Sequence, residues 1–198
     1  MIHKDAVSVA MDVLKRMAPA CERIAIAGSI RRHKACCKDV EIVFVPQMQR
    51  VQREQADLFS YADKPRTDYR IQALIRDGFW SFDEKVKRNG PKYKRLIHRA
   101  SSMTIELFRA WPENWGLQMV LRTGPAEFNH LLVTNWHFDG AMPPEMKMQD
   151  GYLWRAGQML QTPTETVFFE ALDLPYWAPQ ERTAELLKTY LNGGAYER

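Results

Sequence analysis

The apolar positions of the first 110 residues change repeatedly between helical and strand spacing. Apolar side chains recur every three or four residues through 5–18, and this predicts an amphipathic helix that ends before Pro19. A second helix is predicted over 68–77, with Gly78 at its end. The turn Asn89-Gly90-Pro91 predicts a hairpin between two strands. Short apolar or alternating runs predict strands at 23–27, 40–45, 79–86, 92–98 and 102–109.

From about residue 112 the pattern becomes more helical. Helices are predicted at 124–136, 162–172 and 181–191, and a small hairpin at 151–160. The start of the 162–172 helix combines an N-cap threonine, a proline and an acid in the first turn. We therefore expect a mixed α/β (α+β) fold, with a mixed β-sheet in residues 1–113 and a smaller, α-rich part with a short hairpin in residues 114–198.

Composition narrows the class of protein without identifying it. With 198 residues, 45% of them hydrophobic, the chain can build a core as one domain or two small ones. It has 28 lysines and arginines against 24 acids, an excess that suits nucleic acid only where the charges cluster. No apolar run approaches the ~20 residues of a membrane-spanning helix. We expect a cytoplasmic monomer of a bacterial or phage-infected cell, with Cys21, Cys36 and Cys37 as reduced thiols.

The run Gly28-Ser29-Ile30-Arg31-Arg32 carries the first candidate chemistry. A glycine-serine turn at the start of a helix presents backbone N–H groups, a hydroxyl and two guanidiniums, which together suit a phosphate group. Taken alone, Gly-Ser is also an ordinary helix N-cap. The acids that follow about ten residues later make the phosphate interpretation specific.

Asp39 and Glu41 lie two residues apart in an apolar run, so both carboxylates should leave the same face of a strand. Adjacent carboxylates repel each other unless a cation lies between them. Two-metal phosphoryl transfer needs oxygen ligands for ions about 4 Å apart, so a third acid from a neighbouring strand is expected. Glu106 in the apolar run 103–108 fits that role, although alone it could be an exposed acid on a half-buried strand. A phosphate site close to a metal site predicts nucleotidyl transfer.

A second basic cluster lies on the predicted hairpin before the strand of Glu106. It could follow the backbone of a nucleic acid, or form an ordinary charged surface. Its candidate contacts are Lys87, Arg88, Lys92, Lys94 and Arg95.

The order and spacing of these motifs resemble the family X DNA polymerases, the group of DNA polymerase beta and terminal transferase. The run 28–32 with Asp39-Val40-Glu41 resembles the family's GS-x-RR and D-x-D signature. Ile105-Glu106-Leu107-Phe108 resembles its third-carboxylate strand. Leu121-Arg122-Thr123-Gly124 resembles the turn on which the nucleotide sugar rests, and Phe128-Asn129 the place of an asparagine that faces the base.

The likeness continues to residues 151–182, which are similar to the family's closing hairpin and final helices. It therefore covers nearly the whole chain, and it implies a catalytic palm in 1–113 and a nucleotide-closing subdomain in 114–198. The chain would be a minimal form without the family's N-terminal helix-hairpin-helix domain.

The resemblance implies gap filling or short extension of a DNA primer with a nucleoside triphosphate, as in DNA repair. Two Mg²⁺ ions, for which Mn²⁺ can substitute, would be the cofactors. The implied roles are metal binding by Asp39, Glu41 and Glu106, triphosphate binding by Gly28, Ser29 and Arg32, sugar binding by Thr123 and Gly124, and base recognition by Asn129.

Several positions depart from the family pattern. Glu41 and Glu106 are glutamates rather than aspartates, so the metal geometry can differ. Leu121 and Arg122 stand where the family has two aromatics, which weakens the expected exclusion of ribonucleotides, and Val133 stands where it often has an arginine that checks the template pair. Two alternatives therefore stay open: transfer to an RNA end or to a protein hydroxyl, and a non-catalytic nucleic-acid-binding remnant.

Overall fold

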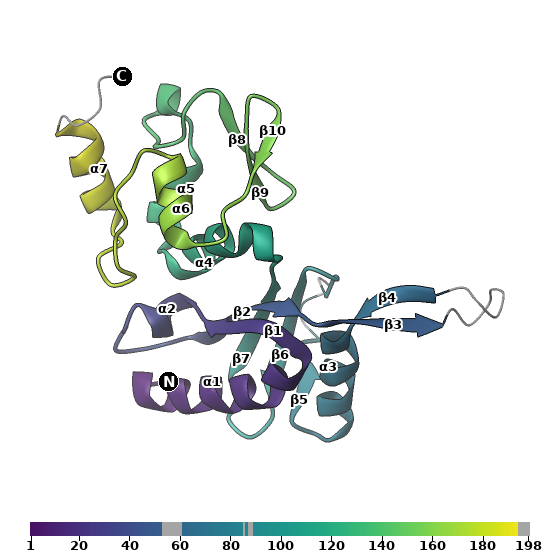
Figure 1. Cartoon of the computed structure of the whole chain (residues 1–198). Helices are drawn as coiled ribbons and strands as arrows, with labels where there is room; N and C mark the ends of the chain where they lie inside the picture. The colour runs from purple at the N-terminus through teal and green to yellow at the C-terminus, as the bar shows by residue number, and fades with distance from the viewer. Residues whose placement is uncertain (53–60, 85, 87–88, 194–198) are drawn as a thin grey trace. The chain divides into compact units, whose positions relative to one another are not determined.

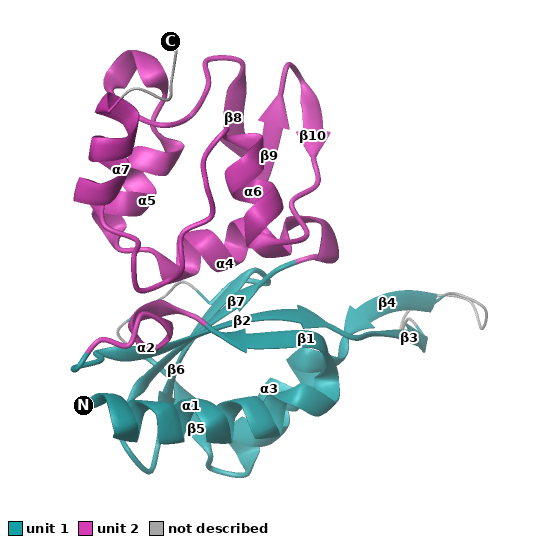
Figure 2. Cartoon of the chain, turned by 60° about the vertical axis from the view of Figure 1, so that its left-hand side comes forward, with its two compact units in different colours: residues 1–26, 35–110 teal, residues 27–34, 111–198 magenta. Residues whose placement is uncertain are grey.

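The computed structural model describes residues 1–52, 61–84, 86 and 89–193 (Figure 1). The chain divides into two compact units (Figure 2). Unit 1 consists of residues 1–26 and 35–110, and unit 2 of residues 27–34 and 111–198. Within the described ranges, no helix combines the length and the apolar character needed to cross a membrane. The assignment of 1–113 to a palm and of 114–198 to a closing subdomain stays a prediction.

Unit 1 is built on a mixed five-stranded sheet. Its strands, in spatial order, are β1 (Cys21–Ile26), β2 (Asp39–Pro46), β7 (Thr104–Arg109), β6 (Tyr93–His98) and β5 (Trp80–Phe82). Only the pairing of β2 with β7 is parallel among these neighbours. Val40 and Ile42 on β2, and Ile105 and Leu107 on β7, are completely buried. Because side chains alternate along a strand, the acids between these positions must face the other side of the sheet.

Two helices cover the sheet of unit 1. Helix α1 (His3–Met17) packs against β1 and β2, and α3 (Arg66–Arg76) packs against β5 and α1 (Figure 1). The buried side chains of α1 include Val13 and Met17, and those of α3 include Ile71 and Leu74. The apolar spacing that predicts helices at 5–18 and 68–77 is therefore the spacing of their buried faces.

A separate two-stranded hairpin in unit 1 is missing from the sequence-based prediction. It pairs β3 (Met48–Gln52) with β4 (Tyr61–Pro65) in antiparallel register. Both strands consist of exposed and partly exposed residues and contain no buried position. With polar residues on both faces, these segments lack the alternation of apolar and polar residues from which a strand is predicted.

Unit 2 combines short helices with a small antiparallel sheet. Its helices are α2 (Gly28–Arg31), α4 (Trp115–Thr123), α5 (Ala126–Val133), α6 (Glu165–Ala171) and α7 (Ala184–Asn192). Its sheet contains β8 (Met146–Gln149), β9 (Tyr152–Arg155) and β10 (Gln158–Leu160) in the order β10-β9-β8. Each of these elements, apart from β10, places at least one side chain in the interior.

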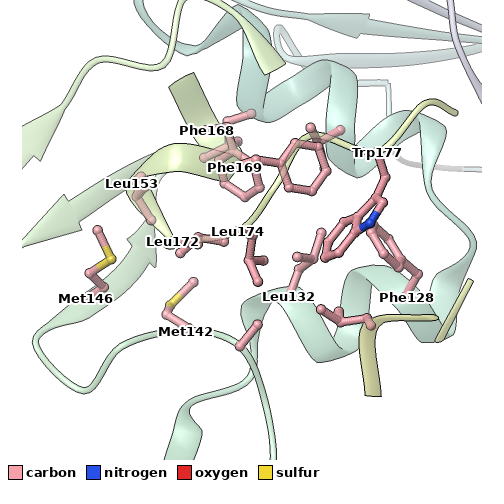
Figure 3. Close-up of a cluster of buried hydrophobic side chains, with 14 of the residues drawn as sticks. Phe128, Leu132, Met142, Met146, Leu153, Phe168, Phe169, Leu172, Leu174 and Trp177 are labelled. Atoms are coloured by element: carbon pink, nitrogen blue, oxygen red, sulfur yellow. The ribbon is translucent and has the colours of Figure 1, made fainter. Parts of the chain in front are cut away.

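The core of unit 2 is rich in aromatic rings (Figure 3). Phe168 and Phe169 of α6 are fully buried, and the ring of Phe169 meets the ring of Trp177 edge-on, with centroids 5.7 Å apart. Trp177 also meets Phe128 of α5 edge-on. These arrangements suit the quadrupoles of the rings and join the loop before α7 to α5 and α6.

The predicted mixed α/β fold class is confirmed. The predicted helix at 124–136 ends earlier, at Val133, because Thr134 is extended. Helix α4 and strand β8 are absent from the prediction. Seven of the nine residues of α4 are buried. The helix follows Pro112 closely and contains Gly116, and both residue types are unfavourable inside helices, so its apolar run does not indicate a helix.

Gly116 of α4 offers a test of this packing. Its N–H donates to the Thr162 carbonyl at 2.7 Å, and a Cβ at this position would lie 1.9 Å from the carbonyl oxygen of Thr164. Backbone atoms cannot rotate away as a flexible side chain can. We expect Gly116→Ala to lower the free energy of unfolding by about 1–3 kcal/mol, measured by chemical denaturation.

Gly90→Ala is the matched control, because a Cβ there would meet nothing within 4 Å in the part of the chain that the structure describes. Equal stability of the two variants would contradict the close packing of α4 against the chain before α6.

Candidate active site

The parallel pairing of β2 with β7 brings three acids to one face of the sheet in unit 1. The register places Glu41 directly opposite Glu106, and Asp39 opposite Thr104. Paired residues of neighbouring strands point to the same face, so the three carboxylates leave the sheet together. Each of these acids is partly exposed, while the residues between them are buried. A surface of clustered carboxylates over an apolar core is the result.

The Glu106 carboxylate is held by two side chains of the adjacent strand β6. The Tyr93 hydroxyl donates to Glu106 Oε1 at 2.8 Å, and Arg95 Nη1 donates to the same oxygen at 3.3 Å. Arg95 Nε also donates to Asp83 Oδ2 at 2.9 Å. The guanidinium therefore bridges two carboxylates, whose side chains are 16% (Glu106) and 10% (Asp83) exposed.

The environment of Tyr93 keeps its hydroxyl protonated. Burial, together with the hydrogen bond to Glu106 and the charge of that carboxylate, raises the pKa of Tyr93 to about 12. At neutral pH the hydroxyl is therefore a neutral donor to Glu106.

The three acids supply the type of ligand that a divalent metal ion needs, but their side chains are not arranged around a common point. Carboxylate oxygens are the ligands that Mg²⁺ prefers. Yet among the described residues, no group of three His, Cys, Asp or Glu side chains is placed to hold a metal ion. Glu106 Oε1 already accepts hydrogen bonds from Tyr93 and Arg95.

The predicted phosphate turn lies in unit 2, on the segment 27–34. Gly28 has a φ of +63°, a conformation that glycine adopts without strain, and the four-residue helix α2 begins there. The Ser29 Oγ is buried and has no hydrogen-bond partner among the described residues. A buried hydroxyl without a partner is costly, so this atom is suited to an additional ligand.

Both arginines of the turn bind to Thr123 at the end of α4. Arg31 Nη1 donates to Thr123 Oγ1 at 3.1 Å, and Arg32 Nη1 donates to the Thr123 carbonyl oxygen. The predicted triphosphate turn and the predicted sugar turn are thus in direct contact within unit 2. Thr123 is completely buried, so its side chain serves this packing.

Glu165, at the first position of α6, joins two arginines in a buried ion-pair network. Arg31 donates to its two oxygens at 2.8 and 2.5 Å, and Arg182 Nη1 donates to Oε1 at 2.8 Å. The Arg182 side chain is 0% exposed. Burial acts to raise the pKa of Glu165, but the hydrogen bond from Arg31 and the charge of Arg182 outweigh it, so the pKa lies below its ordinary value.

Asn129 of α5 closes the turn that follows α4. Its Nδ2 donates to the carbonyl oxygens of Leu121 at 2.7 Å and Gly124 at 3.1 Å. A Cβ at Gly124 would lie 2.2 Å from Asn129 Oδ1, so a larger residue there would displace the Asn129 amide. Asn129 Oδ1 is buried and has no partner within the described part of the chain. The predicted sugar and base contacts of these residues stay predictions.

The predicted nucleic-acid contacts on the 79–98 hairpin are only partly described. Lys87 and Arg88 lie outside the described residues. Lys94 Nζ donates to the Gly90 carbonyl oxygen at 3.4 Å, and the guanidinium of Arg95 binds the two acids named above. The contact of Lys92, Lys94 and Arg95 with nucleic acid stays a prediction.

Sequence reasoning missed four residues that shape these sites. Tyr93 and Asp83 act on Glu106 and Arg95, and Glu165 and Arg182 anchor the phosphate turn. The spacing of Tyr93 and Arg95 places them on one face of a strand, which is a weak signal. Their pairing with Glu106 depends on the register between strands, which the sequence pattern does not reveal.

Comparison with known proteins identifies a solved structure with a similar fold. The sequence matches no protein-family model and no curated protein. Among solved structures, it is similar to polymerase beta of Leishmania infantum in a ternary P/T complex. The likeness covers 92% of this chain and 76% of that chain, with a TM-score of 0.69 and 14% identity. The chain therefore has a polymerase beta-like fold, as the resemblance of its motifs implies. At this identity the likeness shows the fold alone.

Glu165→Gln tests the network beneath the phosphate turn. The change keeps the shape but removes the charge between Arg31 and the buried Arg182, so we expect a loss of about 3 kcal/mol in unfolding free energy at pH 7. Because the pKa of Glu165 is lowered by folding, its contribution is complete above its ordinary value of 4.5 and is lost as the pH falls through the folded value. The stability difference between the two proteins should therefore shrink as the pH falls below 4.5 and disappear only below the folded pKa of Glu165.

Glu170→Gln is the control, because Glu170 is an exposed acid on the same helix. A pH-independent difference for Glu165→Gln would show that its carboxylate charge does not stabilise unit 2.

Proposed function

We propose that this chain is a metal-dependent nucleotidyltransferase of the family X DNA polymerase kind. It would transfer a nucleotide from a nucleoside triphosphate to a nucleic-acid 3′-hydroxyl and release pyrophosphate. The observation that carries the proposal is the register of β2 with β7, which sets Glu41 beside Glu106 and Asp39 on the same face of a polymerase beta-like fold. Adjacent carboxylates of this kind are costly without a cation.

The proposed cofactor is Mg²⁺, two ions of which would be held by Asp39, Glu41 and Glu106, with Mn²⁺ as a substitute. When bound, such ions activate the attacking hydroxyl and neutralise the triphosphate. The chain's own contribution is to hold the carboxylates on a rigid sheet. Tyr93 supports this role, because its hydroxyl fixes the orientation of the Glu106 carboxylate.

The proposed nucleotide site uses the turns of unit 2. Gly28, Ser29 and Arg32 would bind the triphosphate, and the buried Ser29 hydroxyl without a partner among the described residues supports this role. Gly124 would contact the sugar, and the completely buried Thr123 would hold this turn in place through its bonds to Arg31 and Arg32. Asn129 would contact the base through Oδ1, the atom that has no partner within the described residues, while its Nδ2 keeps the turn closed.

DNA is the proposed acceptor, as a primer with its template or as a gapped duplex. The similar polymerase beta was crystallised as a ternary P/T complex, and this favours DNA here as well. A second candidate is transfer to an RNA end or a protein hydroxyl. Leu121 and Arg122 favour it, because neither supplies an aromatic surface beside the proposed sugar site that would reject a ribonucleotide.

The test is extension of a labelled primer alone, on a template and across a one-nucleotide gap, with dNTPs or NTPs and with Mg²⁺ or Mn²⁺. We expect extension that follows the template and prefers dNTPs. Asp39→Ala combined with Glu41→Ala should reduce the rate by roughly a thousandfold or more, because the ligands act as a unit. Glu22→Gln, an exposed acid on β1, should leave the rate unchanged.

Each contrary result has a distinct meaning. Equal activity of the double variant would overturn the assignment of the acids. Transfer of NTPs to RNA or protein in place of DNA would support the second candidate. Nucleotide binding without transfer to any acceptor would indicate a non-catalytic binding protein.

A further inference from the structure

The face of the sheet that carries Asp39, Glu41 and Glu106 is called the acid face below. Arg95 lies on this face, next to Glu106, and so far it is only a candidate contact of nucleic acid. It stands directly opposite Glu106 in the antiparallel pairing of β6 with β7, so both side chains leave the same face of the sheet. Its guanidinium binds Glu106 through Nη1 at 3.3 Å and Asp83 through Nε at 2.9 Å. Different nitrogens serve the two acids, so the contact with Asp83 can persist when the contact with Glu106 is broken.

The bonds to Glu106 are directed to one of its two oxygens. Tyr93 and Arg95 both bind Oε1, so Oε2 carries neither of these bonds. A metal ion that takes Glu106 as a ligand would therefore meet a carboxylate whose orientation is already set. It would also meet a positive charge within a few ångströms, and two cations at such a distance repel each other.

We propose that Arg95 is a positioning residue that serves as the internal counter-cation of the acid face. Without a divalent ion, Arg95 neutralises Glu106 and limits the repulsion among Asp39, Glu41 and Glu106. Binding of a divalent ion weakens its hold on Glu106, and Asp83 retains the guanidinium. Asp83 thereby sets how strongly Arg95 competes with the ion. This inference rests on the proposed function, in which these three acids bind metal.

Two substitutions should shift metal affinity in opposite directions. Arg95→Gln keeps a hydrogen-bonding amide but removes the positive charge, so the dissociation constant for Mn²⁺ should fall by about five- to tenfold. Asp83→Asn removes the acid that retains Arg95, so the same constant should rise by a similar factor. The probe is Mn²⁺ alone, titrated into the full chain without nucleotide and followed by electron paramagnetic resonance of the free ion.

Three further variants separate charge from structure. Arg95→Lys keeps the charge and should bind Mn²⁺ as the unchanged protein does. Tyr93→Phe changes no charge and should shift the dissociation constant for Mn²⁺ less than about twofold. It should lower kcat more than it changes KM, because the Glu106 carboxylate is less well oriented. Arg99→Gln removes the same charge as Arg95→Gln from an exposed position about 13 Å further along the chain, beyond the screening length in physiological salt. It should leave the affinity unchanged.

Failure of this inference can be told apart from failure of the proposed function. Suppose that the unchanged protein binds Mn²⁺ and extends primers, but Arg95→Gln and Asp83→Asn both weaken Mn²⁺ binding or both leave it unchanged. Arg95 then only links Glu106 and Asp83 structurally and does not act as the counter-cation. If Mn²⁺ binding survives Asp39→Ala with Glu41→Ala, the acid face is not the metal site and both proposals fail. Thermal denaturation of each variant identifies any change in Mn²⁺ affinity that arises from unfolding. If Arg95→Gln does not fold, Arg95→Lys replaces it: unchanged Mn²⁺ affinity supports a role of the positive charge, and a changed affinity contradicts it.

Discussion

The parallel pairing of β2 with β7 is the constraint on which the candidate chemistry depends. Two strands far apart in the sequence, in a sheet whose other pairings are antiparallel, place Glu41 beside Glu106. The register is set by apolar residues, because Ile42 and Leu107 lie opposite each other and are completely buried. A slip of one residue would turn one strand's acids into the core and its apolar side chains toward water. Core packing and site geometry are therefore the same requirement.

Neighbouring side chains on the acid face partly neutralise the negative charge that this register brings together. Tyr93 and Arg95 come from the strand on the other side of β7 and bind the same oxygen of Glu106. Asp83, just beyond β5, holds the far side of the guanidinium. In this hydrogen-bonded arrangement the Arg95 guanidinium offsets part of the negative charge of the acids. In unit 2 a similar device, Glu165 between Arg31 and Arg182, anchors the predicted phosphate turn to α6.

Local features of the fold and site could be predicted from the sequence, and non-local ones could not. The two-residue spacing of Asp39 and Glu41 in an apolar run predicts their common face, and apolar spacing predicts α1. The pairing of Arg31 with Glu165 spans 134 residues, and nothing in the pattern of either segment indicates it. Helix α4 is not predicted because Gly116 and the nearby Pro112 are unfavourable in helices. The β3–β4 hairpin is not predicted because neither of its faces is buried.

The central claim is that Asp39, Glu41 and Glu106 form the metal-binding part of a nucleotidyl transfer site. Its most direct test is a crystal structure with Mn²⁺ and a non-hydrolysable nucleoside triphosphate, with the metal located by its anomalous scattering. The account predicts Mn²⁺ bound to oxygens of Glu41 and Glu106, with Arg95 on Asp83. Bound nucleotide with Mn²⁺ only on other residues, and with Arg95 still on Glu106, would contradict it.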